Sequence, residues 1–397
     1  MIAVEVALSR VVAGLVPTPG ELVALPQALG RVLAEDCAAR VAHPPLDVSS
    51  MDGYAVRAAD SPGPLRLIGE AAAGRRFAGT VGPGQAVRVF TGGALPAGAD
   101  TVAMQEDCRQ DGNLVSIDAE PRPGQFIRRA GMDFHLGAPL LTAGTVLGPR
   151  QIALAAAMNL PWLPVRRRPR VAVLSTGDEI AMPGEPLQPA RLPSSNGPAV
   201  AALVAANGGE PVQLGIAADT RQSLEAMIAA AQGCDLLVTS GGASVGDYDM
   251  VQEVLGGHGF DLDFWKIAMR PGKPLMFGRL RQVPVLGLPG NPVAAMVCSI
   301  VFLRPMLRAL LGLPPADPLG SAELAADLPA NDARQDYVRA RLGRRDDGRT
   351  VAEPCGRQDS AMISGLAAAD CLIVRPPHAA PARAGDRVTI LPLDATC

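Results

Sequence analysis

Two pairs of carboxylates directly follow apolar segments, where a strand would end. Asp178 and Glu179 lie in STGDEI after VAVLS, and Asp247 and Asp249 lie in SGGASVGDYD after LLVTS. If both segments are parallel strands, the four carboxylates meet at one edge of a sheet, since the carboxyl ends of such strands share that edge. Carboxylates beside Gly-rich turns suit a hard divalent cation such as Mg²⁺. Any one of them could equally stabilise a helix start, but the group favours a site.

Three basic residues lie close together in FWKIAMRPGKP, namely Lys266, Arg270 and Lys273. A proline follows Arg270 and another follows Lys273, which favours extended backbone at both residues and a loop that projects its side chains. Such a loop could clamp an oxyanion or a phosphate, although a solvated surface is the alternative. The next turn, GLPGNP, precedes an apolar helix and predicts a rigid wall for a ligand.

Two polar, Gly-bearing stretches stand in the N-terminal half. SSMDGYA has Asp52 near its centre, and TGGALPAGAD begins with Thr91. Ordinary turn chemistry would explain both stretches. The sequence has no Ser/His/Asp or Cys/His set, no GxGxxG after a strand and no GxxxxGK[ST], so hydrolase, dehydrogenase and P-loop functions lose their usual support.

Composition limits the number of domains and the remaining classes of function. A chain of 397 residues predicts two to four domains, and 48% apolar with 19% charged residues is enough to bury their cores. The net charge of −3 and an aromatic content of 3% favour neither nucleic acid nor an anionic membrane as a partner. Seven dispersed cysteines, the closest pair being 355 and 371, exclude a zinc knuckle and fit a reducing compartment.

Targeting signals are not expected. Glu5 stands where a signal peptide would carry its basic region. The longest uncharged run, 286–303, begins with LGLPGNP and leaves about twelve helical residues, too few to span a bilayer. The sequence therefore predicts a cytoplasmic protein.

The periodicity of apolar residues then predicts the elements that position these groups. A helix is expected over 4–15, a β-rich region over 65–148 and a short helix over 151–158. After the basic segment 166–170, three apolar strands alternate with helices, the pattern of a doubly wound parallel sheet. The predicted strands are 171–175, 236–240 and 283–288. Beyond a linker after Leu313, the runs YVRARL, CLIVRP and RVTILPL predict a small β domain.

Seven motifs together resemble the MoeA family and the gephyrin E domain, a likeness that covers roughly residues 1–310. In chain order they are SSMDGYA, TGGALPAGADTVAMQE, IRRAGMD, STGDE, SGGASVGDYD, KIAMRPGKP and GLPGNP. The resemblance implies a multidomain α/β fold with four parts. They are a doubly wound parallel-sheet domain of the molybdopterin-binding type (169–313), a β-rich inserted domain (41–131), a small linking α/β domain from segments 1–40 and 132–168, and a C-terminal β-barrel-like domain (320–397).

The same resemblance implies a molybdopterin molybdenumtransferase. Such an enzyme inserts molybdate into adenylylated molybdopterin and releases AMP, with Mg²⁺ as cofactor. The substrate's own dithiolene sulfurs hold the metal, so the protein needs no cysteine ligands. The family also implies a cytoplasmic homodimer whose shared active site joins the sheet domain of one chain to the MDGY loop of the other. Other enzymes of molybdenum cofactor synthesis are possible partners.

The family's functional positions fall on residues of both halves. The catalytic positions are Asp52, Thr91, Asp133, Glu179, Asp219, Asp249, Lys266 and Lys273. The implied substrate-binding positions are Arg270, Gly241, Gly242, Ser244, Pro289, Pro292 and Ser360. The implied metal ligands are Asp219, Asp249 and Glu179.

The sequence departs from the family pattern at three positions, and two alternative functions stay open. Val48 stands where the family usually has asparagine, Arg270 where lysine is frequent and Ala243 where valine is common. Arginine keeps the charge of lysine but not its geometry. One alternative is the molybdopterin adenylyltransferase, whose single domain resembles residues 170–313 and which consumes ATP. The other is a gephyrin-like scaffold protein, for which the sequence shows neither a long linker nor a partner-binding domain.

Overall fold

The computed structural model describes residues 1–241, 248–315 and 319–393, and residues 248–252 by their backbone alone. The chain divides into two compact units. The sheet-barrel unit comprises Met1–Glu21, Gly30–Ala34 and Arg166–Cys397, and the insert unit comprises Leu22–Leu29 and Glu35–Val165. The boundary at Arg166 coincides with the basic segment at which the sequence changes its pattern. Each unit is described by itself below.

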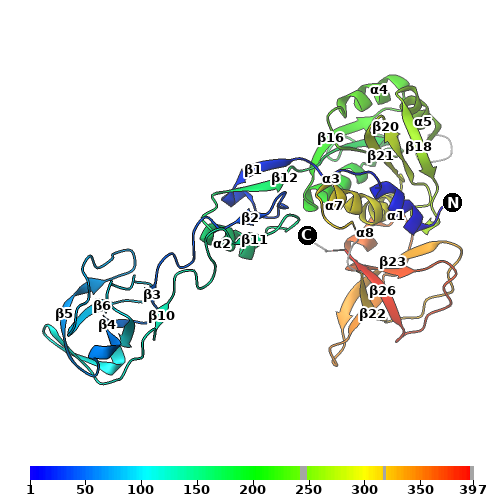
Figure 1. The fold of residues 1–397 in the computed structure, drawn as a ribbon. Coiled ribbons are helices and arrows are strands. Elements are labelled where there is room, and N and C mark those ends of the chain that lie inside the picture. Colours follow the sequence, from blue (N-terminus) through cyan, green and yellow to red (C-terminus); the bar gives the residue numbers. More distant parts are fainter. Residues whose placement is uncertain (242–247, 316–318, 394–397) are drawn as a thin grey trace. The chain divides into compact units, whose positions relative to one another are not determined.

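The sheet-barrel unit is built on a six-stranded sheet with the order β16-β13-β17-β21-β20-β18 (Figure 1). Four neighbouring strands are parallel, and the last two are antiparallel to their neighbours. The parallel strands are β13 (Arg170–Thr176), β16 (Glu210–Ala217), β17 (Leu236–Ser240) and β21 (Val283–Leu288). The antiparallel strands are β18 (Phe260–Trp265) and β20 (Met276–Leu280). The three strands expected from the sequence are thus confirmed, and so is the parallel sheet.

Helices cover both faces of this sheet, as in a doubly wound fold (Figure 1). On one face α4 (Arg221–Ala230) and α5 (Tyr248–Gly257) bury Leu224 and Leu255 against the strands. On the other face lie α3 (Asn196–Ala206), α1 (Val4–Val12) and the long helix described next. Since Val4, Ala7 and Val11 of α1 are buried in this core, residues 1–21 belong to the sheet-barrel unit rather than to the linking segments expected over 1–40.

The helix after GLPGNP is longer than the sequence indicated. It runs without interruption through α6 (Pro292–Cys298), a π-helical stretch (Ser299–Leu303) and α7 (Arg304–Leu310). The uncharged run 286–303 holds the expected twelve helical residues, Pro292–Leu303, but the helix does not end with that run. The wider π-helical turn carries it past Pro305, whose missing N–H and bulky ring usually end a helix. Its 19 residues are long and apolar enough to cross a membrane by length and composition alone, but 83% of that stretch is buried inside the protein. Arg304 is itself buried, so this is a core helix.

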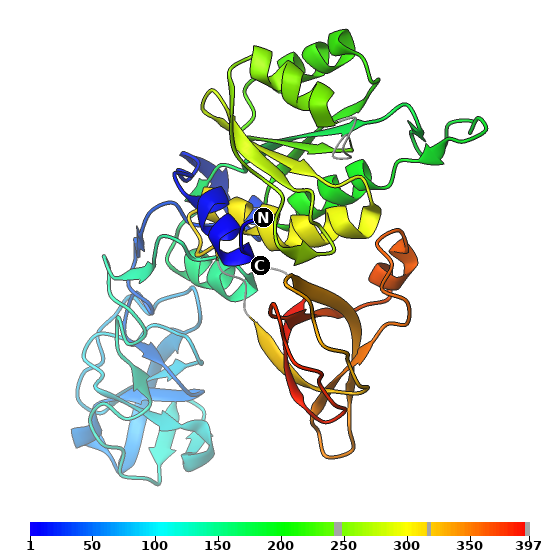
Figure 2. The ribbon, with the colours of Figure 1, turned by 90° about the vertical axis from the view of Figure 1, so that its right-hand side faces the viewer.

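The C-terminal strands form a closed barrel, because β23 pairs with both β24 and β25 (Figure 2). The barrel strands are β22 (Gly320–Leu324), β23 (Gln335–Arg344), β24 (Thr350–Pro354), β25 (Cys371–Arg375) and β26 (Arg387–Pro392). A short helix, α8 (Ile363–Ala367), precedes β25. The two-residue strand β19 (Met269–Arg270), from the basic loop, pairs parallel with β23 and fastens the barrel to the sheet domain.

The insert unit holds a second six-stranded sheet, in the order β7-β4-β6-β5-β9-β8. Its strands are β4 (Gly53–Val56), β5 (Gly63–Ala71), β6 (Gln85–Val89), β7 (Thr101–Met104), β8 (Cys108–Asp111) and β9 (Leu114–Ile117). The linking elements of this unit are β2 (Cys37–Ala38), β3 (Val48–Ser49), β10 (Ile127–Arg128), β11 (Pro139–Leu141) and α2 (Pro149–Ala157). The chain passes between the units along the paired strands β1 (Gly20–Ala24) and β12 (Trp162–Arg166).

Candidate functional site

The carboxyl ends of β13, β17 and β21 lie at one edge of the sheet, and we call it the strand-end edge. Gly241 directly follows β17 with φ +100°, and a Cβ there would lie 2.2 Å from the carbonyl oxygen of Thr176. Only glycine permits this close approach of two strand ends. The Thr176 hydroxyl oxygen is buried and has no hydrogen-bond partner among the described residues. Buried hydroxyls are usually hydrogen-bonded, so the Thr176 hydroxyl is available to form a hydrogen bond with a ligand at this edge.

Two carboxylates face each other across the ends of β13 and β16. The Asp178 N–H donates to Asp219 Oδ2 at 3.3 Å, and the Asp219 N–H donates to Asp178 Oδ1 at 3.2 Å. The Glu179 side chain instead bends back over Gly177: its Oε2 atom lies 2.5 Å from the position that a Cβ on this glycine would take. Asp178, which the family resemblance did not single out, thus contacts Asp219 directly.

Part of the expected metal site lies outside the described residues. Gly242, Ala243, Ser244 and Asp247 are not described, nor is the side chain of Asp249. Over the part of the chain that is described, no group of three His, Cys, Asp or Glu side chains could hold a metal ion. The described carboxylates at this edge fit Mg²⁺ in kind, because that ion takes one or two protein carboxylates and completes its shell with water and substrate oxygens.

An asparagine that sequence reasoning missed connects two of the turns. Asn196 Nδ2 donates to Ser240 Oγ and to the carbonyl oxygen of Gly290, both at 2.8 Å. These bonds tie the end of β17 to the GLPGNP turn, where Pro289 is buried and Pro292 begins α6. The only signal in the sequence is a polar SSN segment before the apolar run of α3.

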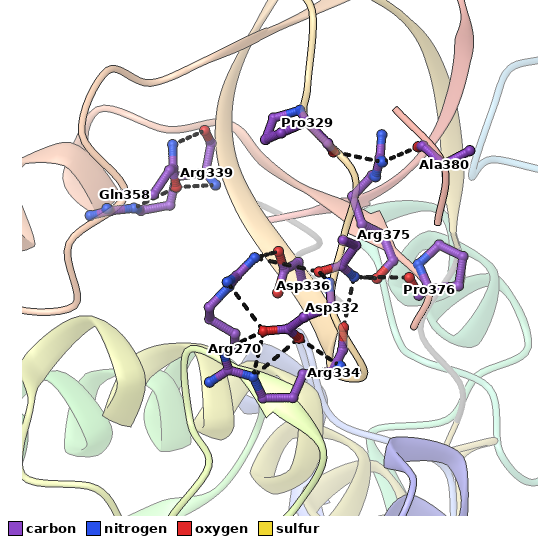
Figure 3. Close-up of polar contacts among 11 residues, drawn as sticks. Arg270, Pro329, Asp332, Arg334, Asp336, Arg339, Gln358, Arg375, Pro376 and Ala380 are labelled. Atoms are coloured by element: carbon purple, nitrogen blue, oxygen red, sulfur yellow. Dashed lines mark hydrogen bonds and ion pairs between the residues drawn. The ribbon is translucent and has the colours of Figure 1, made fainter. Parts of the chain in front are cut away.

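The three basic residues of the predicted anion loop have different surroundings. Lys273 is exposed, and Lys266 Nζ lies 3.9 Å from the centre of the Trp265 ring. Arg270 instead pairs with Asp336 and with Asp332, the latter at 3.6 Å (Figure 3). Strand pairing explains why Arg270 does not project from the loop as expected, because the β19–β23 register places Arg270 opposite Asp336. Arg270 thus fastens the barrel, and its charge is largely compensated.

Ser360, the tail residue implied by the resemblance, lies at the GLPGNP turn. Its hydroxyl accepts a hydrogen bond from Asn291 Nδ2 at 3.0 Å, and its carbonyl oxygen accepts one from the Val293 N–H at 3.0 Å. The loop of the barrel that carries Ser360 therefore covers the start of α6.

In the insert unit, Asp52 and Thr91 form a direct pair. Asp52 Oδ1 accepts hydrogen bonds from the Thr91 N–H at 2.7 Å and from the Thr91 hydroxyl at 2.8 Å. These donors, the backbone N–H first, hold the pKa of the Asp52 carboxyl below its usual value, so the group stays ionised near neutral pH. The sequence placed these residues 39 positions apart in two separate turns.

Asp133 lines a cleft of about 720 Å³ in the same unit, together with Val48 and Gly92. Its N–H donates to the carbonyl oxygen of His43 at 3.0 Å. Arg128 also lines the cleft, so both signs of charge are available to a ligand there.

The glycine of the MDGY motif is required by the fold, which gives a first prediction. A Cβ at Gly53 would lie 1.9 Å from the carbonyl oxygen of Ala103 on the paired strand β7. We expect Gly53→Ala to destabilise the protein by about 3 kcal/mol or more, because the ladder must open to admit the methyl group. Gly256→Ala, where the new methyl meets no atom within 4 Å, is the control. Equal calorimetric unfolding temperatures for the two variants would contradict the prediction.

Comparisons with known proteins agree along the whole chain. Residues 2–159 match the MoeA N-terminal region (domains I and II), residues 172–309 a probable molybdopterin-binding domain, and residues 321–393 the MoeA C-terminal region (domain IV). A molybdopterin molybdenumtransferase of Haemophilus influenzae is 36% identical over 95% of both chains. One of a Nostoc species is 43% identical over 74% of this chain and 70% of its own. The crystal structure of a MoeA protein from Pyrococcus horikoshii aligns with a TM-score of 0.87 at 31% identity, covering 99% of each chain.

The fold and the strand-end edge define a multidomain α/β protein with a molybdopterin-binding type of sheet domain. Family matches to three successive regions, and relatives above 30% identity that span most of the chain, make the assignment more specific. The chain belongs to the MoeA family and is a transferase of molybdenum cofactor biosynthesis.

Proposed function

We propose that the protein inserts molybdenum from molybdate into adenylylated molybdopterin and releases AMP. The observation that carries this proposal is the strand-end edge, where glycine turns at Gly177 and Gly241 flank the unpartnered Thr176 hydroxyl. Turns of this kind allow the phosphates of a ligand to approach the backbone closely. The names of the relatives supply the reaction class.

Asp219 is proposed to serve the divalent cation, with Asp249 and Glu179 as further candidate ligands and Mg²⁺ as the ion. When bound, Mg²⁺ would neutralise charge on the pyrophosphate of the substrate and polarise the bond to the leaving group. Asp178 orients Asp219 through their paired hydrogen bonds. In the insert unit, Thr91 holds the ionised Asp52 in place through two hydrogen bonds, and Asp52 is proposed to contact the substrate.

Lys273 is the residue we propose for binding molybdate, because it is exposed while Arg270 is paired and Lys266 lies over an aromatic ring. We expect Lys273→Ala to raise the apparent dissociation constant for molybdate about tenfold, because the variant loses one charge-assisted contact. Salt should weaken molybdate binding by the parent more than by the variant. Arg344→Ala, which removes an exposed charge on the barrel, is the control. Equal salt slopes for parent and Lys273→Ala, measured by isothermal titration, would count against direct contact.

Assembly and location are also proposals. We propose a homodimer in which the insert unit of one chain completes the site of the other, a cytoplasmic location, and contacts with other enzymes of molybdenum cofactor synthesis. The insert unit and the sheet-barrel unit each carry part of the expected site, in keeping with a site assembled from more than one piece.

The proposed reaction is tested by comparing two substrate mixtures. With adenylylated molybdopterin and molybdate, the protein should release AMP without ATP. With free molybdopterin and ATP, it should form no pyrophosphate. The opposite pattern would identify the adenylyltransferase, the alternative that the sheet domain alone suggested.

A further inference from the structure

The guanidinium of Arg339 is the centre of a hydrogen-bond cluster on the outer face of the barrel, because its neighbours Val338 and Ala340 on β23 face the barrel core. The residue is 1% exposed. Its Nη1 atom donates to the carbonyl oxygen of Met362 at 2.8 Å, and Nη2 donates to those of Arg357 and Asp359 at 3.0 Å each. All three carbonyls belong to residues 357–362, which we call the Ser360 loop. One buried side chain thus fixes the backbone of this loop at three points.

Gln358 strengthens the same attachment (Figure 3). Its side-chain oxygen accepts from the Arg339 N–H at 3.0 Å and from Nε at 3.3 Å, and its side-chain nitrogen donates to the Arg339 carbonyl oxygen at 3.1 Å. Within the described part of the chain, Arg339 forms no ion pair. All three of its side-chain nitrogens therefore donate to oxygens of the Ser360 loop.

The Ser360 loop connects the Arg339 cluster to the strand-end edge through hydrogen bonds. Ser360 accepts hydrogen bonds from Asn291 Nδ2 and from the Val293 N–H. The neighbouring Gly290 carbonyl accepts from Asn196, which also donates to Ser240. A continuous chain of contacts thus leads from the buried arginine to the last residue of β17.

We propose that Arg339 is a positioning residue: it holds Ser360 against the GLPGNP turn, so that the barrel sets the geometry of the strand-end edge. In this role Arg339 does not touch the substrate. Its effect on turnover depends on the proposed function, but its effect on the loop does not. The barrel is then a structural part of the active site rather than an appendage.

Hydrogen exchange of the protein without substrates tests the proposal. The reporter is the amide of Val293, since Pro292 has no N–H and the Val293 N–H donates to Ser360. The amide of Ala361, which donates to Asp359 Oδ1 at 2.8 Å, reports on the loop itself. In Arg339→Met both amides should exchange about tenfold faster than in the parent, and in Arg339→Lys by an intermediate factor, because an ammonium group can bond some of the carbonyls.

Arg375→Met is the matched control. Arg375 is also buried, and it lines a cleft of about 250 Å³ together with Arg339, but its guanidinium donates to the carbonyl oxygens of Pro329 and Ala380 instead. This variant should leave the exchange of Val293 and Ala361 at the parent rate. Equal exchange in Arg339→Met and the parent would overturn the proposal, and so would equal acceleration by Arg375→Met. If Arg339→Met does not fold, Arg339→Lys decides the question by the same criterion.

Turnover separates a positioning role from direct contact. If molybdenum insertion falls in Arg339→Lys while Val293 exchange stays at the parent rate, Arg339 acts on the substrate itself and the proposal is wrong. If exchange rises as expected and the parent shows no molybdenum insertion, the proposed function fails and the positioning role stands.

Discussion

Asp219→Asn should lose at least about a hundredfold of molybdenum insertion while keeping the fold, because the carboxylate charge is needed for the cation and not for folding. Asparagine has the same shape and retains a side-chain oxygen that can accept from the Asp178 N–H. The substitution therefore removes charge and leaves the loop contact. The expected change is in activity and in Mg²⁺ dependence, with the unfolding temperature within about 2 °C of the parent.

The matched control for this prediction is Asp261→Asn, an exposed aspartate on β18 of the same sheet. Its activity should equal that of the parent. Titration with Mg²⁺ in the presence of the adenylylated substrate completes the measurement. If Asp219→Asn responds to Mg²⁺ with the parent's midpoint and amplitude, Asp219 is not a ligand of the cation.

The second large effect concerns a site shared between two chains. Asp52 lies in the insert unit and Asp219 in the sheet-barrel unit, and in the proposed homodimer each chain lends Asp52 to its partner. Asp52→Ala and Asp219→Ala should each be inactive alone. Random mixing makes about half of the dimers mixed, and each mixed dimer has one intact site of two, so roughly a quarter of parent activity should return.

The mixing experiment requires evidence that subunits exchange. The two variants are unfolded and refolded together, and native mass spectrometry counts the mixed dimers. If mixed dimers form and activity stays at the level of the single variants, both residues act within one chain. Each variant unfolded and refolded alone is the control.

Three strands of the parallel sheet could be predicted from the sequence because they are short, mainly apolar and followed by glycine-containing turns. Strands β17 and β21 match the expected ranges, β13 is longer by one residue at each end, and the ends of all three share one edge as expected. The long helix was underestimated, since neither the π-helical stretch nor the burial of Arg304 leaves a local signal. Local patterns report periodicity and breakers, whereas both of these features depend on packing.

Contacts between residues distant in sequence were the part of the site that could not be predicted. The pairing of Arg270 with Asp336 spans 66 positions, and the contact of Asn291 with Ser360 spans 69. Both arise from the docking of the barrel on the sheet domain. The resemblance to the family named Ser360, but only the structure shows that a buried arginine holds its loop in place.

Measuring AMP and molybdenum in one reaction is the decisive test of the proposed molybdenum insertion. The purified protein is incubated with adenylylated molybdopterin, Mg²⁺ and molybdate, without ATP, and the pterin product is separated for elemental analysis. We expect one AMP released for each molybdenum atom bound to the pterin, and no molybdenum in the product of Asp219→Asn. Release of AMP that leaves the pterin without molybdenum, in the presence of saturating molybdate, would contradict it.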